Sequence, residues 1–239
     1  PTICISHYLM SLTTIFFDLD HTLWDFETNS TETLKEIIED FKLEEKGLIS
    51  SINFIRRYQQ INDQLWDEYR KGLIDRETLR NTRFHRALLE FNINDQAMAN
   101  DIGEYYLRAS PLKRNLFPHA IETLSYLKKK YELHIITNGF NEVQFIKLDK
   151  SGLLPFFKHV ITSEAANSKK PEHKIFEYAL NLSSSSVEQS LMIGDSMEQD
   201  ILGAKNFGMQ QVFFNPGKIK HDEKISYEIH SLDELKNIL

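Results

Sequence analysis

Five short apolar segments, with helical patterns between most of them, are the feature that most limits the fold of this chain. Each segment is rich in β-branched or aromatic side chains and lacks the polar alternation of a half-exposed strand. Strands of this kind are buried on both faces, as in a parallel sheet covered by helices. We therefore predict an α/β fold with a Rossmann-like parallel-sheet core. The expected strands are Ile15–Phe17, Leu133–Ile136, His159–Thr162, Leu191–Ile193 and Val212–Phe214.

The long stretch between the first two expected strands carries helical periodicity and little strand signal. Apolar residues recur at helical spacing in Leu34–Phe41, Phe54–Tyr69 and Met98–Ala109. Three or four such helices are too many for one crossover connection, so we predict an inserted helical cap domain with its own core. The expected organisation is an α/β core of residues 10–24 and 109–239 and a cap of residues 25–108. Residues 1–9, which precede Met10, are expected to be dispensable to the fold.

The composition excludes several classes of protein. A net charge of −7 disfavours binding to a nucleic-acid polymer, which usually requires a basic excess. No apolar run approaches the length of about 18 residues that spans a bilayer, and the first segment lacks the features of a signal peptide. The single cysteine, Cys4, permits neither an internal disulfide nor a Cys-rich zinc site. We expect a cytoplasmic protein without a membrane or nucleic-acid polymer as partner, and the sequence leaves its oligomeric state open.

Polar clusters follow several of the expected strands, where an open α/β sheet places its ligands. Asp18 and Asp20 follow the first strand, and Thr137-Asn138-Gly139 ends the second. Gly194-Asp195-Ser196 ends the fourth, with Asp200 five residues after Asp195. Lys169-Lys170-Pro171 lies between these last two clusters. We expect the four clusters to form one site.

The residue types in these clusters favour phosphoryl transfer. Asp18, Asp20 and Asp195 would repel one another unless a cation lay among them, and oxygen ligands suit Mg²⁺. Lys170 can bind a phosphate and keep a nucleophilic Asp ionised. The Thr137 hydroxyl and nearby main-chain N–H groups add donors for a phosphoryl group. Each motif alone also fits a turn cap or a solvated Lys pair, but the combination indicates a small phosphorylated substrate.

The motifs, in this order and spacing, resemble those of the haloacid dehalogenase-like (HAD) hydrolase superfamily. They are FDLDHT at 17–22, ITNG at 136–139, KKP at 169–171 and GDSMEQD at 194–200. The resemblance covers Ile15–Leu239, and the insertion is similar to the helical cap of the first HAD subclass. Residues 65–69, 136–140, 169–180 and 200–209 further resemble the bacterial housecleaning pyrimidine 5′-nucleotidases. Those enzymes remove phosphate from pyrimidine nucleoside monophosphates, including non-canonical ones.

The resemblance implies a Mg²⁺-dependent phosphatase acting on nucleoside 5′-monophosphates through an aspartyl phosphate. Asp18 would be the nucleophile, and Asp20 the general acid and then the base, held protonated at first by its surroundings. The carboxylates of Asp18 and Asp195 and the main-chain carbonyl of Asp20 would bind Mg²⁺, with Asp200 orienting these ligands. The residues implied to hold the phosphoryl oxygens are Thr137, Asn138 and Lys170.

Two positions depart from the family pattern. His21 stands where many relatives have Gly, and we expect a spacer or substrate-side residue rather than a metal ligand. The segment Ala165–Lys169 differs from the small run that is common before the lysine. We assign the site role to Lys170 rather than Lys169 because Lys170 adjoins Pro171.

We expect the cap to determine which substrate is selected, because the α/β core contacts only the phosphate group. The candidates for contacting the substrate beyond its phosphate are Trp24, Trp66, Tyr69, Arg83 and Phe84. Aromatic residues at helical spacing also fit packing within the cap, so both interpretations stay open.

The alternative functions are a phosphatase for a sugar phosphate or another small phosphoester, a haloacid dehalogenase, and a regulator in which Asp18 only accepts phosphate. The second acid, Asp20, argues against the dehalogenase and the regulator.

Overall fold

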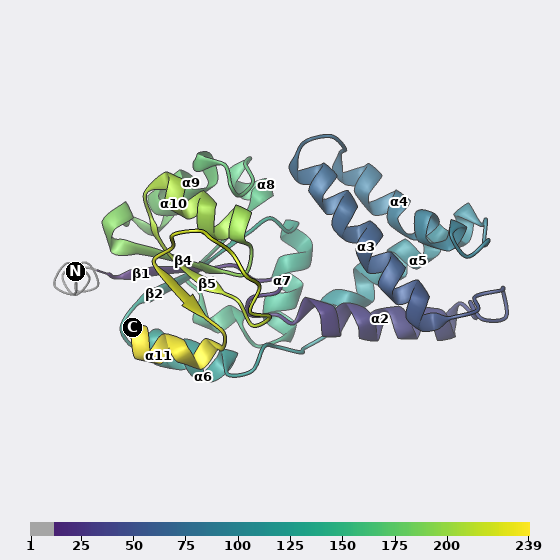
Figure 1. Cartoon of the computed structure of the whole chain (residues 1–239), viewed down its shortest axis with the longest axis horizontal. Helices are drawn as coiled ribbons and strands as arrows, with labels where there is room; N and C mark the ends of the chain where they lie inside the picture. The colour runs from purple at the N-terminus through teal and green to yellow at the C-terminus, as the bar shows by residue number, and fades with distance from the viewer. Residues whose placement is uncertain (1–11) are drawn as a thin grey trace. The chain divides into compact units, whose positions relative to one another are not determined.

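The computed structural model describes residues 12–239, so the expectations for residues 1–9, Met10 and Cys4 lie outside the described residues. The described chain divides into two compact units (Figure 1). We call residues 12–26 and 114–239 the core unit, and residues 27–113 the cap unit. Whether each unit folds as an independent domain with the predicted boundaries stays a prediction. Among residues 12–239, no helix combines the length and apolar character needed to cross a bilayer.

The core unit is built on six parallel strands in the order β3-β2-β1-β4-β5-β6. This confirms the predicted α/β class, and each expected apolar segment lies within one of the first five strands. The sixth strand was not predicted because it has three residues and only the last is buried. The strands are β1 (Thr14–Phe17), β2 (Glu132–Thr137), β3 (His159–Thr162), β4 (Ser190–Gly194), β5 (Gln210–Phe214) and β6 (Tyr227–Ile229).

Successive residues of the central strand supply two separate hydrophobic layers. Ile15 and Phe17 pack on one face with residues of α6 (Ala120–Leu127) and α11 (Leu235–Ile238). Phe16 packs on the opposite face with residues of α9 (His173–Ser183) and α10 (Gly203–Phe207). Figure 1 shows these two pairs of helices on opposite sides of the strands. Both faces are therefore buried, which explains why the strand segments show no polar alternation.

Shorter elements complete the core unit. A π-helical segment, Met197–Leu202, leads into α10, and Ser186 and Gln189 cap the turn before β4 through reciprocal hydrogen bonds. The remaining helices of the core unit are α7 (Asn141–Lys150) and α8 (Ser163–Ala166). The 3₁₀ turns of the core unit are Leu154–Phe156, Val187–Gln189 and Leu232–Glu234.

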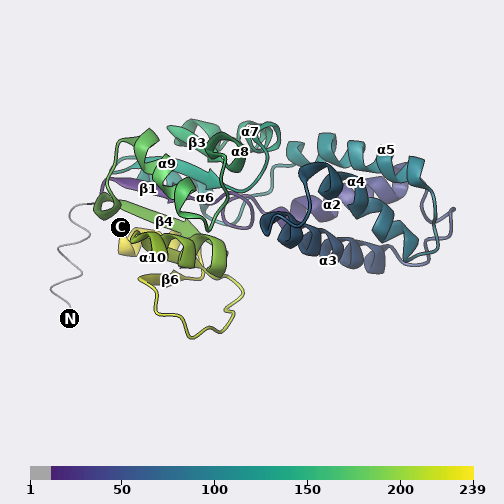
Figure 2. The same ribbon diagram turned by 90° about the horizontal axis from the view of Figure 1, so that it is seen from above.

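The cap unit is helical, with α4 packed against both α3 and α5 (Figure 2). Three of its helices start with a side chain that accepts a hydrogen bond from the main-chain N–H three residues later. These N-cap residues satisfy helix-end donors that would otherwise lack a partner. They are Ser50, Asp75 and Asp95. The helices are α2 (Phe26–Asp40), α3 (Ser51–Arg70), α4 (Arg76–Leu89) and α5 (Gln96–Ala109), followed by a 3₁₀ turn at Ser110–Leu112.

An aromatic cluster joins the helices of the cap unit. Tyr58 of α3 stacks on Phe84 of α4 with ring centroids 4.5 Å apart, and Phe84 lies 5.4 Å from Tyr106 of α5. The Tyr106 hydroxyl donates a hydrogen bond to Ser30 Oγ of α2 over 2.9 Å. The cap unit therefore has a core of its own, and the helical periodicity in the sequence reports the packing of that core.

A histidine pair lies in the sheet of the core unit. His134 of β2 is fully buried, and its ring stacks on His159 of β3 with centroids 5.2 Å apart and planes 9° apart. Burial, followed by the charge of His159, lowers the pKa of His134 to about 4. Glu132 opposes this shift and Lys158 adds to it. The folded chain therefore favours neutral His134 well below the pH at which the unfolded chain protonates it.

We predict that acidification from about pH 6.5 to about pH 4 lowers the free energy of unfolding by about 3 kcal/mol through His134 alone. In this window His134 is protonated in the unfolded chain but neutral in the folded chain. The free energy of unfolding therefore falls as the pH falls. Urea unfolding of the parent and of His134→Leu across the window measures the effect. The variant should show a correspondingly flatter pH dependence, and parallel curves would contradict the prediction.

Candidate active site

The predicted polar clusters meet at the carboxyl ends of three neighbouring strands. Asp18 follows β1, Thr137 is the last residue of β2, and Asp195 follows β4. Because β2 and β4 pair with β1 on either side, these residues lie at one edge of the sheet. The main-chain N–H of Asp18 donates to the carbonyl of Ile193 over 2.8 Å, which extends the β1–β4 pairing to the nucleophile candidate.

The Lys170 ammonium lies at the centre of this edge. Its side chain is 1% exposed, and Nζ donates to Asp18 Oδ1 at 2.5 Å, to Asp200 Oδ1 at 2.6 Å and to the Ile136 carbonyl at 2.8 Å. These acceptors use all three ammonium protons. Burial alone would lower the pKa of Lys170, but the charges of Asp18 and Asp200 outweigh it and raise the pKa above its ordinary value. Lys170 is thus a fixed cation bonded to the nucleophile candidate.

Three carboxylates at this edge could hold a metal ion. Asp18, Asp195 and Asp200 each place an oxygen within 4.8 Å of the others. Thr22 Oγ1 lies 3.4 Å from Asp18 Oδ2 and 3.0 Å from Asp195 Oδ1, so it bridges the two acids. When ionised, three carboxylates and the Lys170 ammonium sum to −2, the charge that one divalent cation neutralises. Hard oxygen donors with this balance fit Mg²⁺.

The electrostatics of the acids support the fit. Burial raises the pKa of Asp18 well above its ordinary value, although Lys170 opposes the rise. Burial and the charge of Asp200 raise the pKa of Asp195 to about 7. Both shifts arise from negative groups crowded away from water, a situation that a bound cation relieves.

Asp200 accepts a hydrogen bond at each of its carboxylate oxygens. Its Oδ1 accepts from Lys170, and its Oδ2 accepts from the main-chain N–H of Ser196 over 3.0 Å. A Cβ at Gly194 would stand 2.2 Å from Asp200 Oδ2, so only glycine fits at that position. With both oxygens occupied, Asp200 is suited to orient the neighbouring groups, as the sequence predicts.

The phosphate-binding candidates of the second motif have different hydrogen-bond roles. Thr137 Oγ1 accepts from Gly139 N and from Gln144 Nε2, each at 3.1 Å, so its own proton can be donated to a ligand. Asn138 Nδ2 donates to the carbonyl of Lys170, and Asn138 Oδ1 accepts from the Lys170 N–H. The Asn138 side chain thus holds the peptide of Lys170. The group of Asn138 suited to a phosphoryl contact is therefore its main-chain N–H.

Asp20 lies outside the group of three carboxylates. Its Oδ1 accepts from Lys147 Nζ at 2.6 Å and its Oδ2 from Gln144 Nε2 at 2.8 Å. Burial alone would raise the pKa of Asp20, but the charge of Lys147 and the two hydrogen bonds outweigh it and lower the pKa. The expectation that the surroundings hold Asp20 protonated is therefore wrong for this arrangement. Ionised Asp20 is the favoured form beside Lys147.

Sequence reasoning missed Gln144 and Lys147. The two residues lie three apart in α7, directly after the Thr-Asn-Gly turn, and both are buried, whereas Phe145 and Ile146 between them are exposed. Two polar residues at this spacing share one helix face. That pattern was the available signal, but it also fits an ordinary solvated face.

The structure gives a conformational reason for the unusual position of His21. Its φ is 64°, a left-handed conformation that glycine adopts without strain and that histidine adopts more readily than most residues. The ring lies against Phe26, with centroids 4.7 Å apart. Of the two expectations for His21, the geometry supports a spacer in a tight turn.

The substrate-contact candidates lie in different surroundings. Phe84 and Arg83 are 1% and 4% exposed, and both pack in the aromatic cluster of the cap unit. Trp24 is fully buried in the hydrophobic cluster of the core unit. Trp66 and Tyr69 are partly exposed near the end of α3, with ring centroids 5.7 Å apart. Packing within the cap unit thus explains Arg83 and Phe84, and packing within the core unit explains Trp24. A substrate contact stays a prediction for Trp66 and Tyr69.

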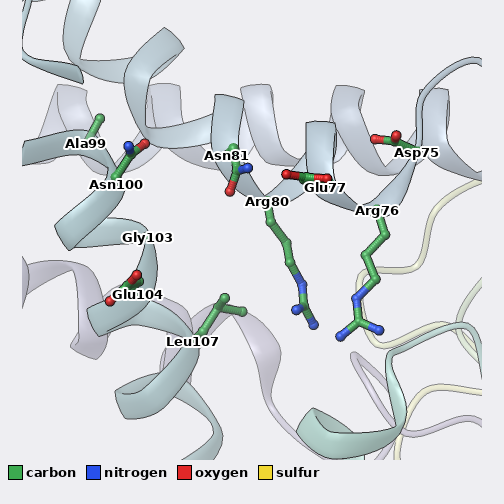
Figure 3. Close-up of a pocket in the computed structure, with 10 residues that line it drawn as sticks. All are labelled: Asp75, Arg76, Glu77, Arg80, Asn81, Ala99, Asn100, Gly103, Glu104 and Leu107. Atoms are coloured by element: carbon green, nitrogen blue, oxygen red, sulfur yellow. The ribbon is translucent and has the colours of Figure 1, made fainter. Parts of the chain in front are cut away.

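A polar pocket of about 630 Å³ lies on the cap unit, between α4 and α5 (Figure 3). The side chains of Arg76 and Arg80 extend from α4 in the same direction in Figure 3. None of the predicted site residues lines this pocket. The lining residues are Asp75, Arg76, Glu77, Arg80, Asn81, Ala99, Asn100, Gly103, Glu104 and Leu107.

Proteins similar to this chain include phosphatases with named substrates. Pyrimidine 5′-nucleotidase PynA of Streptococcus pneumoniae is 30% identical over 94% of this chain and 96% of that protein. A glyceraldehyde 3-phosphate phosphatase of Pyrococcus furiosus is 32% identical over 94% of this chain and 92% of that protein.

A third relative has a solved structure. The HAD-hydrolase YfnB of Bacillus subtilis is 32% identical over 95% of this chain and 94% of that protein. Its magnesium-bound crystal structure matches with a TM-score of 0.83, covering 95% of this chain and 98% of that chain. The family model for haloacid dehalogenase-like hydrolases matches residues 12–208, a span that contains all the polar clusters described above. The chain therefore belongs to the haloacid dehalogenase-like hydrolases, and the protein is an enzyme of that family.

Proposed function

We propose that the protein is a Mg²⁺-dependent phosphomonoesterase of the cytoplasm that hydrolyses nucleoside 5′-monophosphates, pyrimidine ones in particular, through an aspartyl phosphate on Asp18. The observation that carries the proposal is the separate pairing of two acids. Asp18 is bonded to Lys170, and Asp20 is bonded to Lys147 and Gln144. One acid is thereby suited to attack phosphorus and the other to transfer a proton.

The first step forms the bond between an Asp18 carboxylate oxygen and phosphorus and breaks the bond from phosphorus to the leaving alkoxide. Lys170 binds Asp18 Oδ1 and opposes the rise in the pKa of Asp18 that burial causes, and Oδ2 is left as the attacking atom. The Thr137 hydroxyl and the Asn138 N–H donate to the equatorial phosphoryl oxygens. Lys170 joins them if one of its present acceptors is exchanged for phosphate oxygen.

The proton of the leaving group comes from Asp20 in this proposal. A bound phosphoryl dianion raises the pKa of a nearby carboxyl, which opposes the effect of Lys147 and loads Asp20 with a proton as substrate binds. After the alcohol has left, ionised Asp20 takes a proton from the water that attacks the aspartyl phosphate. Phosphate is then released and Asp18 is free again, and Asp20 loses the proton to solvent once the phosphoryl charge has left.

Asp18 and Asp195, with the main-chain carbonyl of Asp20, are the proposed Mg²⁺ ligands, and Asp200 orients them. When bound, Mg²⁺ supplies charge neutralisation between the carboxylates and the phosphoryl oxygens. Thr22 fixes the relative position of the two carboxylate ligands, because its hydroxyl lies within reach of both. The similarity to magnesium-bound YfnB supports this choice of ion.

The similarity to pyrimidine 5′-nucleotidase PynA favours nucleoside monophosphates as substrates. The similarity to a glyceraldehyde 3-phosphate phosphatase gives a second candidate, a small sugar or triose phosphate. Both are small phosphomonoesters, and both require the same chemistry at Asp18 and Asp20. Displacing halide needs no protonated leaving group, so the buried contacts that hold Asp20 favour phosphate ester hydrolysis over dehalogenation.

Asp18→Asn should lower phosphate release from the best substrate by about 1,000-fold or more, because the amide is a poor nucleophile. The matched control is Asp222→Asn, which removes the same charge at an exposed position and should keep full activity. Phosphate release at saturating Mg²⁺, with circular dichroism as the check on folding, measures the effect. Undiminished turnover in Asp18→Asn would refute the proposed function.

Asp195→Asn should weaken Mg²⁺ binding by about 100-fold, since it removes one of two carboxylate ligands. Titration calorimetry measures the affinity, and thermal unfolding provides a second readout. Mg²⁺ should raise the melting temperature of the parent, because it binds the folded state, and should raise it far less in the variant. If Mg²⁺ bound both proteins with the same affinity and raised both melting temperatures equally, Asp195 would not be a ligand of the ion.

A panel of phosphomonoesters separates the two substrate candidates. We expect kcat/KM for UMP, dUMP and dTMP to exceed that for glyceraldehyde 3-phosphate and other sugar phosphates by about 10-fold or more. Purine monophosphates are the control for base recognition and should rank below the pyrimidine ones. The reverse ranking would assign the enzyme to sugar phosphates while leaving the chemistry of Asp18 unchanged.

A further inference from the structure

Both oxygens of the Asp20 carboxylate are held by one helix. Lys147 Nζ and Gln144 Nε2 bind Oδ1 and Oδ2 at 2.6 and 2.8 Å, and the two donors lie one turn apart on α7. A carboxylate held at both oxygens cannot rotate without breaking a bond. The orientation of the Asp20 carboxyl group is therefore fixed by two side chains of α7 and not by the loop that contains Asp20.

The Lys147 ammonium also lies close to two aromatic rings. Lys147 is 4% exposed, and Nζ lies 4.3 Å from the ring centroid of Trp24 and 5.5 Å from that of Phe26. Ring faces attract the cation and keep water away from it. The ammonium has lost its hydration and depends on Asp20 for its counter-charge, so the pair stays together.

Gln144 ties the same carboxylate to the phosphate-binding turn. Its Nε2 donates to Thr137 Oγ1 at 3.1 Å as well as to Asp20 Oδ2. A Cβ on Gly139 would stand 1.6 Å from that Nε2, so the Gln144 side chain occupies the space that glycine leaves. The Thr-Asn-Gly motif therefore makes room for the residue that connects Thr137 with Asp20.

We propose that Lys147 and Gln144 are positioning residues that aim the Asp20 carboxyl at the leaving-group oxygen and keep it from becoming a further carboxylate ligand of the metal. The second effect follows from place and charge. A free carboxylate near Asp18, Asp195 and Asp200 would coordinate a divalent cation, whereas one bonded to an ammonium already has its counter-ion. The inference rests on the proposed phosphatase function.

The test compares two leaving groups. Lys147→Met keeps the length of the side chain and removes its charge, and Gln144→Leu removes the amide. In either variant kcat/KM for the best nucleoside monophosphate should fall by about 100-fold, because its alkoxide needs a proton on departure. For 4-nitrophenyl phosphate kcat/KM should fall by less than about 5-fold, because nitrophenolate leaves without one.

Two substitutions away from Asp20 serve as controls, and one in the phosphate-binding turn provides a second test. Lys150→Met changes a half-exposed lysine at the end of α7 and should leave both rates unchanged. Gly139→Ala should reproduce the loss that depends on the leaving group by displacing Gln144. Gly217→Ala, where a Cβ would meet nothing closer than 3.7 Å, should have no effect.

The outcomes are distinguishable. Equal losses with both substrates would show that α7 only maintains the fold, and unchanged rates would show that Asp20 needs no support; either result overturns the inference. If Lys147→Met fails to fold, Gln144→Leu decides, since it removes no charge. A parent protein inactive on every phosphomonoester would instead refute the proposed function itself.

Discussion

The buried ammonium of Lys170 is the interaction on which the rest of the site depends. It binds Asp18, Asp200 and the Ile136 carbonyl, and so connects the ends of β1 and β2 to the segment that follows β4. Without it, three carboxylates would lie together in a dry environment, and at least one would take up a proton. With it, the remaining charge matches one divalent ion. The lysine therefore determines both whether Asp18 can act as a nucleophile and which cation the site can hold.

The parallel sheet makes this arrangement available because neighbouring strands end at one edge. The close packing there leaves no space at Gly194, where Asp200 passes, or at Gly139, where Gln144 passes. Both glycines have ordinary backbone angles, so the constraint is the absence of a side chain rather than the freedom of the backbone. Both motifs thus need glycine because a neighbouring polar side chain occupies the space that a Cβ atom would fill.

The sequence was sufficient for the fold class and for the meeting of the four motifs. Apolar strands buried on both faces are an unambiguous pattern, and strand ends meet wherever the sheet is parallel. The short edge strand β6 was not predictable, because three residues with one buried side chain show no recognisable pattern of apolar and polar residues. Lys147 and Gln144 were missed because a polar pair on a helix is usually solvated. Only the fold shows that α7 turns that pair inward onto Asp20.

Asp18 and Asp20 show how neighbouring identical side chains acquire different chemistry. In an extended strand, residues two apart point to the same side, and both acids would then face the same cation. Here β1 ends at Phe17, and the N–H groups of Leu23 and Trp24 both donate to the Leu19 carbonyl in a tight turn that has His21 in the left-handed conformation. The turn directs Asp18 toward Lys170 and Asp20 toward Lys147. The turn after β1 thus separates the two acids, and each acid lies against an ammonium partner of its own.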